Sequence, residues 1–185
     1  MNEKNWSRVK TSAAVAVAAV ALIGAWEGLR LYTYRDPIGI PTACYGETRN
    51  IRPLGSRYTR AECDAMLGDA IVDFEKGVRR CLKAPDRIPD KSYVAFISLA
   101  YNIGQGGFCK SSIARYANRY ADTGRLSDLA TACNKIRLYN KAGGRVLKGL
   151  VNRRAQERLL CLEGVREKVV TGVVEGDDAR VPTDD

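Results

Sequence analysis

The apolar positions of this chain begin with a run that has no periodicity. Residues 11–26, TSAAVAVAAVALIGAW, contain no charged side chain, and ten of the sixteen are alanine or valine. As a helix this run would extend about 24 Å, which is less than the ~30 Å hydrocarbon core of a bilayer. The stretch before it carries Lys4, Arg8 and Lys10 against a single Glu3, a bias typical of a cytoplasmic N-terminus followed by an exported body. The run therefore predicts a weak membrane anchor.

Two other interpretations of residues 11–26 remain open. A cleavable signal peptide also has a basic start, an apolar centre and small residues at its end, and cleavage after Ala25 would suit that pattern. An alanine-rich helix of a soluble protein is the third interpretation. Cleavage would make Trp26 the new terminus and would loosen the structure around Glu27, so we favour a retained anchor.

After Glu27 the pattern becomes periodic. Residues 29–34, LRLYTY, alternate Leu and Thr with Arg and Tyr, and this period of two is typical of a half-buried strand. Prolines and glycines interrupt residues 36–58 and break the apolar pieces into turns. We expect a small antiparallel sheet of two or three short strands.

From Thr59 onward the apolar residues recur at helical spacing. Thr59 and Glu62 form a capping-box pattern, and the long helix that follows is expected to lead from the sheet into a second lobe. Later helices are predicted to end at Gly104, at Gly124, at about Asn140 and at Gly164. Residues 175–185 lack aromatic and large aliphatic side chains apart from one valine, and we expect the segment 169–185 to be a disordered acidic tail.

The net positive charge of the body limits the classes of partner but does not select one of them. Residues 1–174 contain 29 basic and 16 acidic side chains, a formal charge of +13, in a chain of 185 residues that suits one domain with appendages. Such a surface attracts anionic polymers, namely nucleic acid, acidic lipid or an acidic cell wall. The sequence has no recognised nucleic-acid-binding motif and no platform of aromatic and basic residues. We therefore expect no nucleic-acid partner.

The six cysteines occur without a CxxC pair, and the chain has no histidine. The common zinc sites need closely spaced cysteines or cysteine with histidine, so we expect no metal and no other cofactor. Disulfides are expected if the body is exported, whereas a cytosolic protein would keep the thiols reduced. Spacing alone leaves 15 possible pairings of six cysteines.

Glu27 and Asp36 are the candidate pair for acid–base chemistry. Glycoside hydrolysis needs a neutral proton donor on one side of the scissile bond and an ionised carboxylate on the other. Trp26 would favour the protonated form of Glu27 by desolvation, and Arg35 would keep Asp36 charged. By itself the pair is a weak signal, because two such residues are most often solvated surface groups.

Three segments together resemble the phage-type lysozymes, the endolysins of glycoside hydrolase family twenty-four. Residues 26–48, WEGLRLYTYRDPIGIPTACYGET, resemble the catalytic segment of that family. Residues 100–115, AYNIGQGGFCKSSIAR, resemble the element on the far side of the cleft. Residues 142–161, AGGRVLKGLVNRRAQERLLC, resemble the family's last box of glycines and arginines. The three segments occur in the family's order and span about 130 of the 185 residues.

The resemblance implies roles for the residues at matching positions. Glu27 matches the general acid, Asp36 the catalytic aspartate, and Thr42 the threonine that helps to hold the attacking water. Substrate-binding roles are implied for Tyr101, Asn102, Gly104, Arg137 and Arg145. For the two arginines, simple exposure to solvent is an equal alternative.

One further box and two departures from the family pattern complete the resemblance. The box contains Gly149, Leu150, Arg153, Arg154 and Glu157, and we favour a helix start with a buried ion pair to Glu157 over substrate contact. Glu47 stands where many members have histidine, which removes a possible local ion pair and adds a carboxylate near the site. Leu138 replaces a common tryptophan and is expected to thin the packing of the C-terminal lobe.

The implied fold is α+β and lysozyme-like, with a small antiparallel sheet lobe joined by a long helix to a mainly helical lobe and the active-site cleft between them. We expect a membrane segment at 1–26, a catalytic domain at 27–168 and the tail at 169–185. Disulfide-bearing members of the family imply the pairs Cys44–Cys63, Cys81–Cys109 and Cys133–Cys161. Each such bridge contributes roughly 2–4 kcal/mol when it is unstrained.

The implied activity is that of an endolysin, a muramidase that hydrolyses the β-1,4 bond between N-acetylmuramic acid and N-acetylglucosamine in peptidoglycan, with inversion. Its action would lyse the host cell and release the phage. The alternative is a non-catalytic peptidoglycan-binding protein anchored at the membrane. We expect a monomer in either case.

The weak anchor is similar to that of the signal-arrest-release subgroup. In this subgroup the host export machinery inserts the segment, here residues 11–26, into the inner membrane, and the body waits in the periplasm until it is released there. We expect the tethered enzyme to be inactive because Glu27 is held at the membrane surface, away from Asp36 and Thr42. Since no cysteine precedes Cys44, refolding of the released segment is the expected trigger, and disulfide exchange with the anchor is not.

Overall fold

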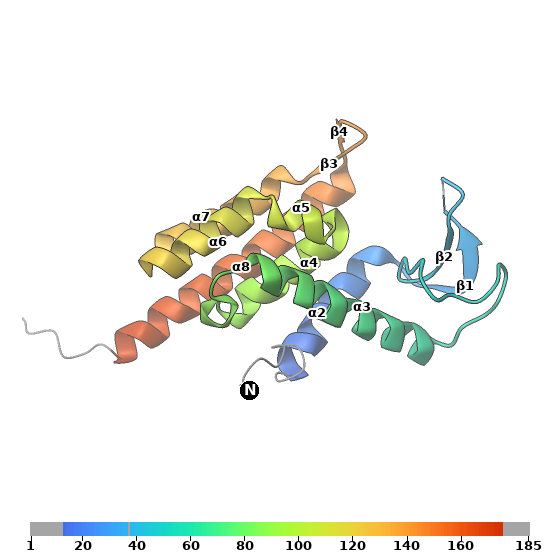
Figure 1. Ribbon diagram of the computed structural model, residues 1–185, viewed down its shortest axis with the longest axis horizontal. Coiled ribbons are helices and arrows are strands. Elements are labelled where there is room, and N and C mark those ends of the chain that lie inside the picture. The colour runs from blue at the N-terminus through green and yellow to red at the C-terminus, as the bar shows by residue number, and fades with distance from the viewer. Residues whose placement is uncertain (1–12, 37, 176–185) are drawn as a thin grey trace, which may run out of the picture.

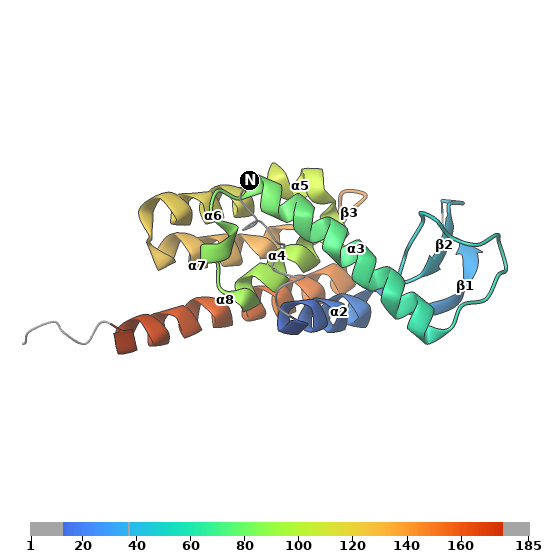
Figure 2. The same cartoon turned by 60° about the horizontal axis from the view of Figure 1, so that its bottom comes forward.

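One long helix, α3 (Arg60–Cys81), joins a small sheet lobe to a larger helical lobe (Figures 1 and 2). The computed structural model describes residues 13–36 and 38–175. The sheet lobe holds β1 (Arg30–Arg35) and β2 (Pro41–Cys44). The expected α+β lysozyme-like architecture, two lobes joined by a helix, is confirmed.

Most of the remaining elements are helices, and α2 comes first in the chain. In order they are α2 (Ala13–Glu27), the 3₁₀ helix η1 (Pro85–Arg87), α4 (Asp90–Ile103), α5 (Gln105–Cys109), α6 (Ser112–Thr123), α7 (Leu126–Lys135), the 3₁₀ helix η2 (Ile136–Leu138) and α8 (Lys148–Glu175). Between η2 and α8 lies a two-stranded hairpin of β3 (Lys141–Ala142) and β4 (Arg145–Val146).

The capping box predicted at the start of α3 is present. The Thr59 hydroxyl accepts a hydrogen bond from the backbone N–H of Glu62, and the Glu62 carboxylate accepts one from the backbone N–H of Thr59. The Glu62 carboxylate also pairs with Arg52 in the loop before the helix. These contacts satisfy orphan backbone donors in the first turn, so the sequence fixes locally where the connecting helix begins.

The sheet is smaller and more exposed than the period of two predicts. β1 and β2 pair antiparallel, with Arg30 opposite Cys44 and Tyr34 opposite Thr42, and the register shifts between these two pairs. Thr33 is the buried residue of β1, because its N–H donates to the carbonyl of Ser56 and its hydroxyl to the carbonyl of Arg52. The other expected core positions of the strand are not buried in this way; Leu31, for example, is 40% exposed.

Helix α4 forms the centre of the helical lobe. Every residue from Ser92 to Ala100 is buried, as expected of a helix that is covered on all sides. Helices α2, α3 and α8 pack against it, and Figure 2 shows α4 between α3 and α8. The helix ends at Gly104, which has a φ of +81°, at the predicted position.

Two predicted helix ends are wrong. α7 stops at Lys135 and continues only as the short 3₁₀ helix η2, so it ends before Asn140. α8 does not stop at Gly164 but runs through it to Glu175. A Cβ atom at Gly164 would lie 2.6 Å from the Ser92 hydroxyl oxygen, so this glycine serves the close approach of α8 to α4. The first residues of the expected tail, 169–175, belong to α8, and 176–185 lie outside the described residues.

Helix α2, which contains most of the expected membrane segment, packs on the helical lobe in this structure. Val15, Ala19 and Ile23 are at most 2% exposed, and α2 contacts α3 and α4. Val17 on the opposite side is 67% exposed. Among the helices of residues 13–36 and 38–175, none combines the length and the apolar composition needed to cross a bilayer.

Three disulfides join neighbouring elements of the chain. They join Cys44 to Cys63, Cys81 to Cys109, and Cys133 to Cys161, which are the pairs that the resemblance implied. The first links the end of β2 to the first turn of α3. The last links α7 to α8, below the β3–β4 hairpin.

Glu62 makes the stability of the start of α3 depend on pH. The backbone N–H of Thr59 and then the Arg52 guanidinium lower the pKa of Glu62 from 4.5 to about 2. A carboxylate whose pKa is lower in the folded state stabilises the protein above its unfolded pKa, and this contribution is lost as the pH falls through the folded pKa. We expect Glu62→Gln to lower the free energy of unfolding at neutral pH, and we expect its difference from the parent to shrink between about pH 4.5 and pH 2. Urea unfolding at a series of pH values measures this, and a difference that is the same at both ends of the window would contradict it.

Candidate active site

Glu27 is the last residue of α2, and its carboxylate points into the body. Gly28, with a φ of +69°, ends the helix and turns the chain toward β1. One Glu27 carboxylate oxygen, Oε1, lies 2.5 Å from a guanidinium nitrogen of Arg153 on α8. The Glu27 side chain is only 20% exposed. The docking of α2 therefore places this carboxylate at a fixed point between the two lobes.

Arg153 is held by a buried charge network. Its Nε lies 3.1 Å from the Glu157 carboxylate, and the Arg154 Nε lies 3.0 Å from the other oxygen of the same carboxylate. The Ser98 hydroxyl of α4 donates to Glu157 at 2.6 Å. Glu157 is fully buried, and both arginines are at most 4% exposed. The ion pair to Glu157 expected from the sequence is present, whereas the contact of Arg153 with Glu27, 126 residues away, was not predicted.

Burial sets the titration of this network. Desolvation raises the pKa of Glu157, and the charges of Arg154 and Arg153 oppose it. Desolvation also lowers the pKa of Arg154 to about 10, with Glu157 opposing. One buried carboxylate thus faces two buried guanidinium groups, and Glu27 supplies the second negative charge.

Asp36 and Thr42 are held together through one residue of the turn between β1 and β2. The Asp36 carboxylate accepts hydrogen bonds from the backbone N–H groups of Ile38, at 3.0 Å, and Ile40, at 2.8 Å. The Thr42 hydroxyl donates to the carbonyl of Ile40 at 3.0 Å. Arg35, expected beside Asp36, donates to the carbonyl of Gly39. The orientation of the Asp36 carboxylate therefore comes from backbone N–H groups of the turn.

The turn after β2 brings the sheet lobe against Glu27. The second Glu27 carboxylate oxygen, Oε2, lies 3.9 Å from the point where a Cβ atom on Gly46 would be. The Tyr101 hydroxyl on α4 donates to the carbonyl of Tyr45 at 3.3 Å. Burial and then the negative charges of Glu27 and Glu47 raise the pKa of Tyr101. Glu27, Tyr101 and the 45–47 turn thus meet at one place.

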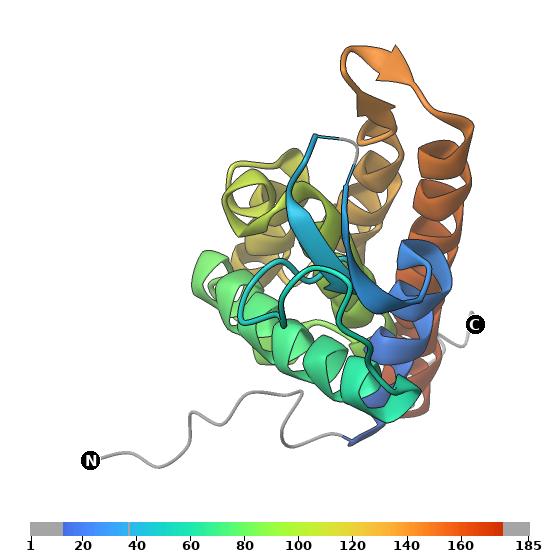
Figure 3. The same cartoon turned by 90° about the vertical axis from the view of Figure 1, so that its right-hand side faces the viewer.

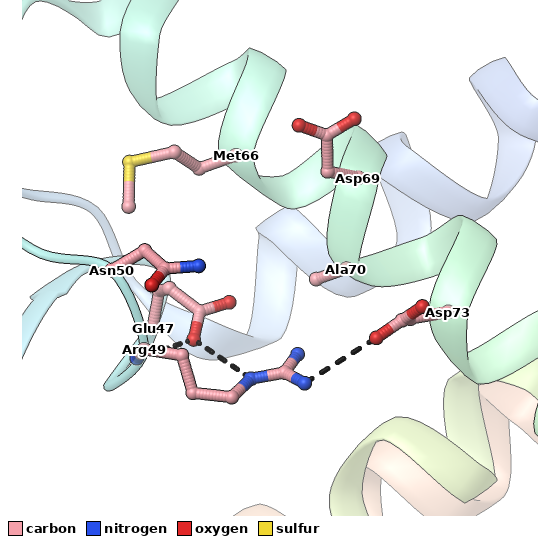
Figure 4. A pocket seen from close by; sticks show the side chains of 7 residues that line it. All are labelled: Glu47, Arg49, Asn50, Met66, Asp69, Ala70 and Asp73. Carbon is pink, nitrogen blue, oxygen red and sulfur yellow. Dashed lines mark hydrogen bonds and ion pairs between the residues drawn. The ribbon is translucent and has the colours of Figure 1, made fainter.

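Two adjoining hollows run from this place along α3. The one at Tyr101 has a volume of about 210 Å³ and is lined by Gly46, Glu47, Thr48, Arg49, Ala70, Phe74, Tyr101 and Gln105. The next has a volume of about 280 Å³ and is lined by Glu47, Arg49, Asn50, Met66, Asp69, Ala70 and Asp73 (Figure 4). Because they share Glu47, Arg49 and Ala70, they form one trough between the sheet lobe and α3.

Arg49 crosses this trough. Its guanidinium lies 3.6 Å from the Glu47 carboxylate and 3.3 Å from that of Asp73 on α3, and Figure 4 shows it between the two. Glu47 also accepts the backbone N–H groups of Thr48 and Arg49. The sequence predicted that Glu47 removes a possible local ion pair and adds a carboxylate near the site. In the structure Arg49 pairs with this carboxylate and with Asp73, so it links the sheet lobe to α3.

The other predicted site residues lie at different distances from this centre. Asn102 is on α4, and its amide oxygen accepts a hydrogen bond from Arg154, while Gly104 ends the same helix. Arg137 in η2 and Arg145 in β4 are exposed, and Leu138 between them is 56% exposed. Among the described residues there is no group of His, Cys, Asp or Glu suited to hold a metal ion.

Known proteins share both the sequence and the fold. Residues 24–157 match the family model described as phage lysozyme. The "SAR-endolysin" of Bacteriophage PS119 is 36% identical over 157 residues, which cover 82% of this chain and 88% of the relative. The active form of the P1 phage endolysin Lyz superposes with a TM-score of 0.70 at 27% identity, covering 86% of this chain and 92% of that one. The secreted inactive form of the same endolysin gives 0.52 at 25% identity, covering 80% and 95%.

Removing the buried carboxylate should cost far more stability than removing an exposed one from the same helix. We expect Glu157→Gln to lower the free energy of unfolding by about 3–5 kcal/mol, because it leaves Arg153 and Arg154 buried without their carboxylate. The matched control is Glu163→Gln, whose half-exposed pair with Lys91 should contribute less than about 1 kcal/mol. Urea unfolding of both variants measures the difference, and equal small losses would show that the network is not held by charge.

Proposed function

This chain belongs to the phage lysozyme family, and on that premise we propose that Glu27, Asp36 and Thr42 carry out its reaction. The protein is a muramidase, a glycoside hydrolase that acts on peptidoglycan. We assign the bond it cleaves as the β-1,4 link between N-acetylmuramic acid and N-acetylglucosamine. The observation that carries the assignment of residues is the position of Glu27, held between the lobes by Arg153.

Glu27 protonates the glycosidic oxygen as the bond breaks. Its Oε1 atom is engaged by Arg153, while Oε2 lies 3.9 Å from the point where a Cβ atom on Gly46 would be, and Gly46 lines the hollow beside Tyr101. Oε2 is therefore the oxygen that carries the proton. Arg153 contacts both Glu27 and Glu157. It therefore fixes the position of the general acid while it also pairs with a second carboxylate.

Asp36 and Thr42 position water on the opposite face of the sugar, which gives inversion. Both are bonded to Ile40, Asp36 through the N–H and Thr42 through the carbonyl. They are thus presented as one unit by the β1–β2 turn. General acid–base catalysis of this kind requires groups that are already oriented when the substrate arrives.

The sugar chain binds in the trough beside Glu27. Tyr101 offers a ring at the inner end of the 210 Å³ hollow, and Asn102 keeps its amide N–H₂ group for substrate because its oxygen is bonded to Arg154. Gly104 ends α4 two residues beyond Asn102. Arg137 and Arg145 are exposed; Arg137 would meet peptide stems, and for Arg145 we take exposure to solvent, the alternative that the sequence left open.

The protein is a signal-arrest-release endolysin. Residues 11–26 are inserted in the host inner membrane by the host export machinery, the body waits in the periplasm without activity, and release of the segment makes the enzyme soluble and active. Two findings support this: α2 is docked on the body in a structure that resembles the active form of P1 Lyz more than the inactive one, and the last residue of α2 is Glu27.

Docking of α2 has two driving forces. Val15 and Ile23 become buried, and each fully buried aliphatic side chain contributes about 1.5–3 kcal/mol. Arg153 also regains a carboxylate partner, because without Glu27 it shares the single Glu157 with Arg154. The body is therefore left with an unbalanced buried cation until α2 returns, which ties completion of the active site to release of the anchor.

Glu27→Gln tests the chemistry. The amide keeps the size of the side chain and can accept from Arg153, but it cannot donate the catalytic proton. We expect the clearing of purified peptidoglycan by folded protein to slow by about 10²–10⁴-fold, and we expect the thermal unfolding midpoint to fall, because Arg153 loses one of its two carboxylate partners. Glu163→Gln, on the exposed face of α8, is the control. Undiminished wall clearing by Glu27→Gln would overturn the assignment and favour a non-catalytic wall-binding role for this site.

Leucine on the exposed face of α2 tests release. Ala18 and Ala21 face solvent in the docked helix, so Ala18→Leu/Ala21→Leu leaves the packed interface alone and makes the segment more favourable in lipid. We expect more protein in the membrane fraction and delayed lysis of expressing cells, with Ala18→Ser/Ala21→Ser shifting both in the other direction.

Ala61→Leu/Ala65→Leu, on the exposed face of α3, is the control for added surface leucine. Prompt lysis by the α2 leucine variant would contradict the release mechanism. So would an equal delay caused by the α3 variant.

A further inference from the structure

The β3–β4 hairpin projects from the helical lobe where the chain enters α8 (Figures 1 and 3). Its turn consists of Gly143 and Gly144, which have φ values of +55° and +77°, as two-residue hairpin turns require. Lys141 pairs with Val146, and Ala142 with Arg145. The N–H of Leu147 donates to the carbonyl of Asn140 and closes the base of the hairpin.

This region is positively charged without any acidic residue nearby in the sequence. Residues 129–156 contain no aspartate or glutamate. The side chains of Arg137, Lys141, Arg145 and Lys148 are all exposed. Elsewhere several basic side chains pair with acids, as Arg79 does with Asp86 and Lys83 with Asp122. Within residues 13–36 and 38–175, none of the four exposed basic side chains around the hairpin forms an ion pair with an acid, so the positive charge of the hairpin is not compensated there.

The same region exposes aliphatic side chains. Leu138 is 56% exposed, Val146 57%, Leu147 45% and Val151 40%. We call Leu138, Lys141, Arg145, Val146, Leu147 and Lys148 the hairpin patch. Aliphatic side chains among cations fit the boundary between lipid headgroups and acyl chains, whereas a polar sugar chain gains little from them and is usually met by aromatic rings.

The elements before and after the hairpin are tied together. The Cys133–Cys161 disulfide joins α7 to α8, and Arg158 on α8 donates to the side chain of Asn134 at 2.7 Å. A surface fixed in this way loses little conformational entropy when it docks. The patch can therefore be presented as a unit to a flat partner.

We propose that the hairpin patch docks on the surface of a membrane that contains anionic phospholipid. Val146 and Leu147 enter the headgroup region, and Lys141, Arg145 and Lys148 face the lipid phosphates. This docking rests on the proposed tether, which would hold the body close to the inner membrane.

Such docking holds the enzyme in the layer between membrane and wall. Before release, it would restrain the tethered body against the bilayer surface. After release, it would slow the escape of the enzyme from that surface. Binding of the patch to the membrane should weaken as ionic strength rises, because salt screens the attraction between exposed cations and lipid phosphates.

Co-sedimentation of the full chain with vesicles tests the proposal. The probes are vesicles of phosphatidylcholine alone and vesicles of phosphatidylcholine with phosphatidylglycerol. We expect the parent to prefer the anionic vesicles at low salt, and we expect Lys141→Gln/Lys148→Gln to lower its partition onto them about thirty-fold. Val146→Ser/Leu147→Ser should weaken binding to the same vesicles while the preference for anionic lipid remains.

Matched controls carry the same substitutions elsewhere on the surface, with α2 unchanged in every protein. Lys76→Gln/Lys110→Gln removes two exposed lysines, and Leu54→Ser removes an aliphatic side chain that is 56% exposed. We expect both controls to bind vesicles as the parent does. Equal binding by the hairpin and control variants would overturn the proposal.

Clearing of purified peptidoglycan separates this proposal from the enzyme's chemistry. We expect the hairpin variants to clear walls at the parental rate, because the substituted residues lie outside the catalytic machinery. Hairpin variants that keep vesicle binding but no longer bind purified walls would overturn lipid docking in favour of a wall-binding surface. Failure of the parent to clear walls would count against the proposed function and would leave vesicle binding unaffected.

Discussion

The ion pair between Glu27 and Arg153 joins the first described helix to the last, and the geometry of the site depends on it. Arg153 is buried and fixed by Glu157 and by the carbonyl of Ser98. Its remaining guanidinium nitrogen is directed at the end of α2. Since a buried charge is costly without a partner, the helical lobe has a built-in requirement for one more carboxylate at this point. The position of Glu27, the proposed general acid, is thus set by the charge balance of the core.

The site residues of the sheet lobe are positioned by backbone hydrogen bonds and not by a buried ion pair. Asp36 and Thr42 depend on backbone groups of their own turn, so their arrangement is local. Arg49 then links that lobe to Asp73 on α3, across an exposed trough. An exposed pair of this kind contributes little free energy, so the two halves of the site are joined loosely on one side, at Arg49, and firmly on the other, at Glu27.

The sequence predicted what depends on near neighbours. The capping box of Thr59 and Glu62, the end of α4 at Gly104 and the buried arginine–glutamate pair at spacings of three and four residues were all readable from local patterns. Gly164 was misread because its role depends on Ser92, a contact between two helices that a local pattern does not reveal. The same is true of Arg49, whose value comes from Asp73, and of Arg153, whose partner Glu27 is 126 residues away. Family resemblance placed Glu27 and Asp36 in one site, and only the structure revealed what holds them.

Helix α2 lies in two environments during its proposed life, and its uniform apolar composition follows from that. A helix made only for the docked state would bury Val15, Ala19 and Ile23 and place polar residues at Val17, Ala18 and Ala21. Here those outward positions stay apolar, although they face water once the helix has docked. They would look like free surface to anyone judging mutational tolerance from the folded enzyme. Polar substitutions there would improve the solubility of the finished protein and weaken its proposed hold on the membrane.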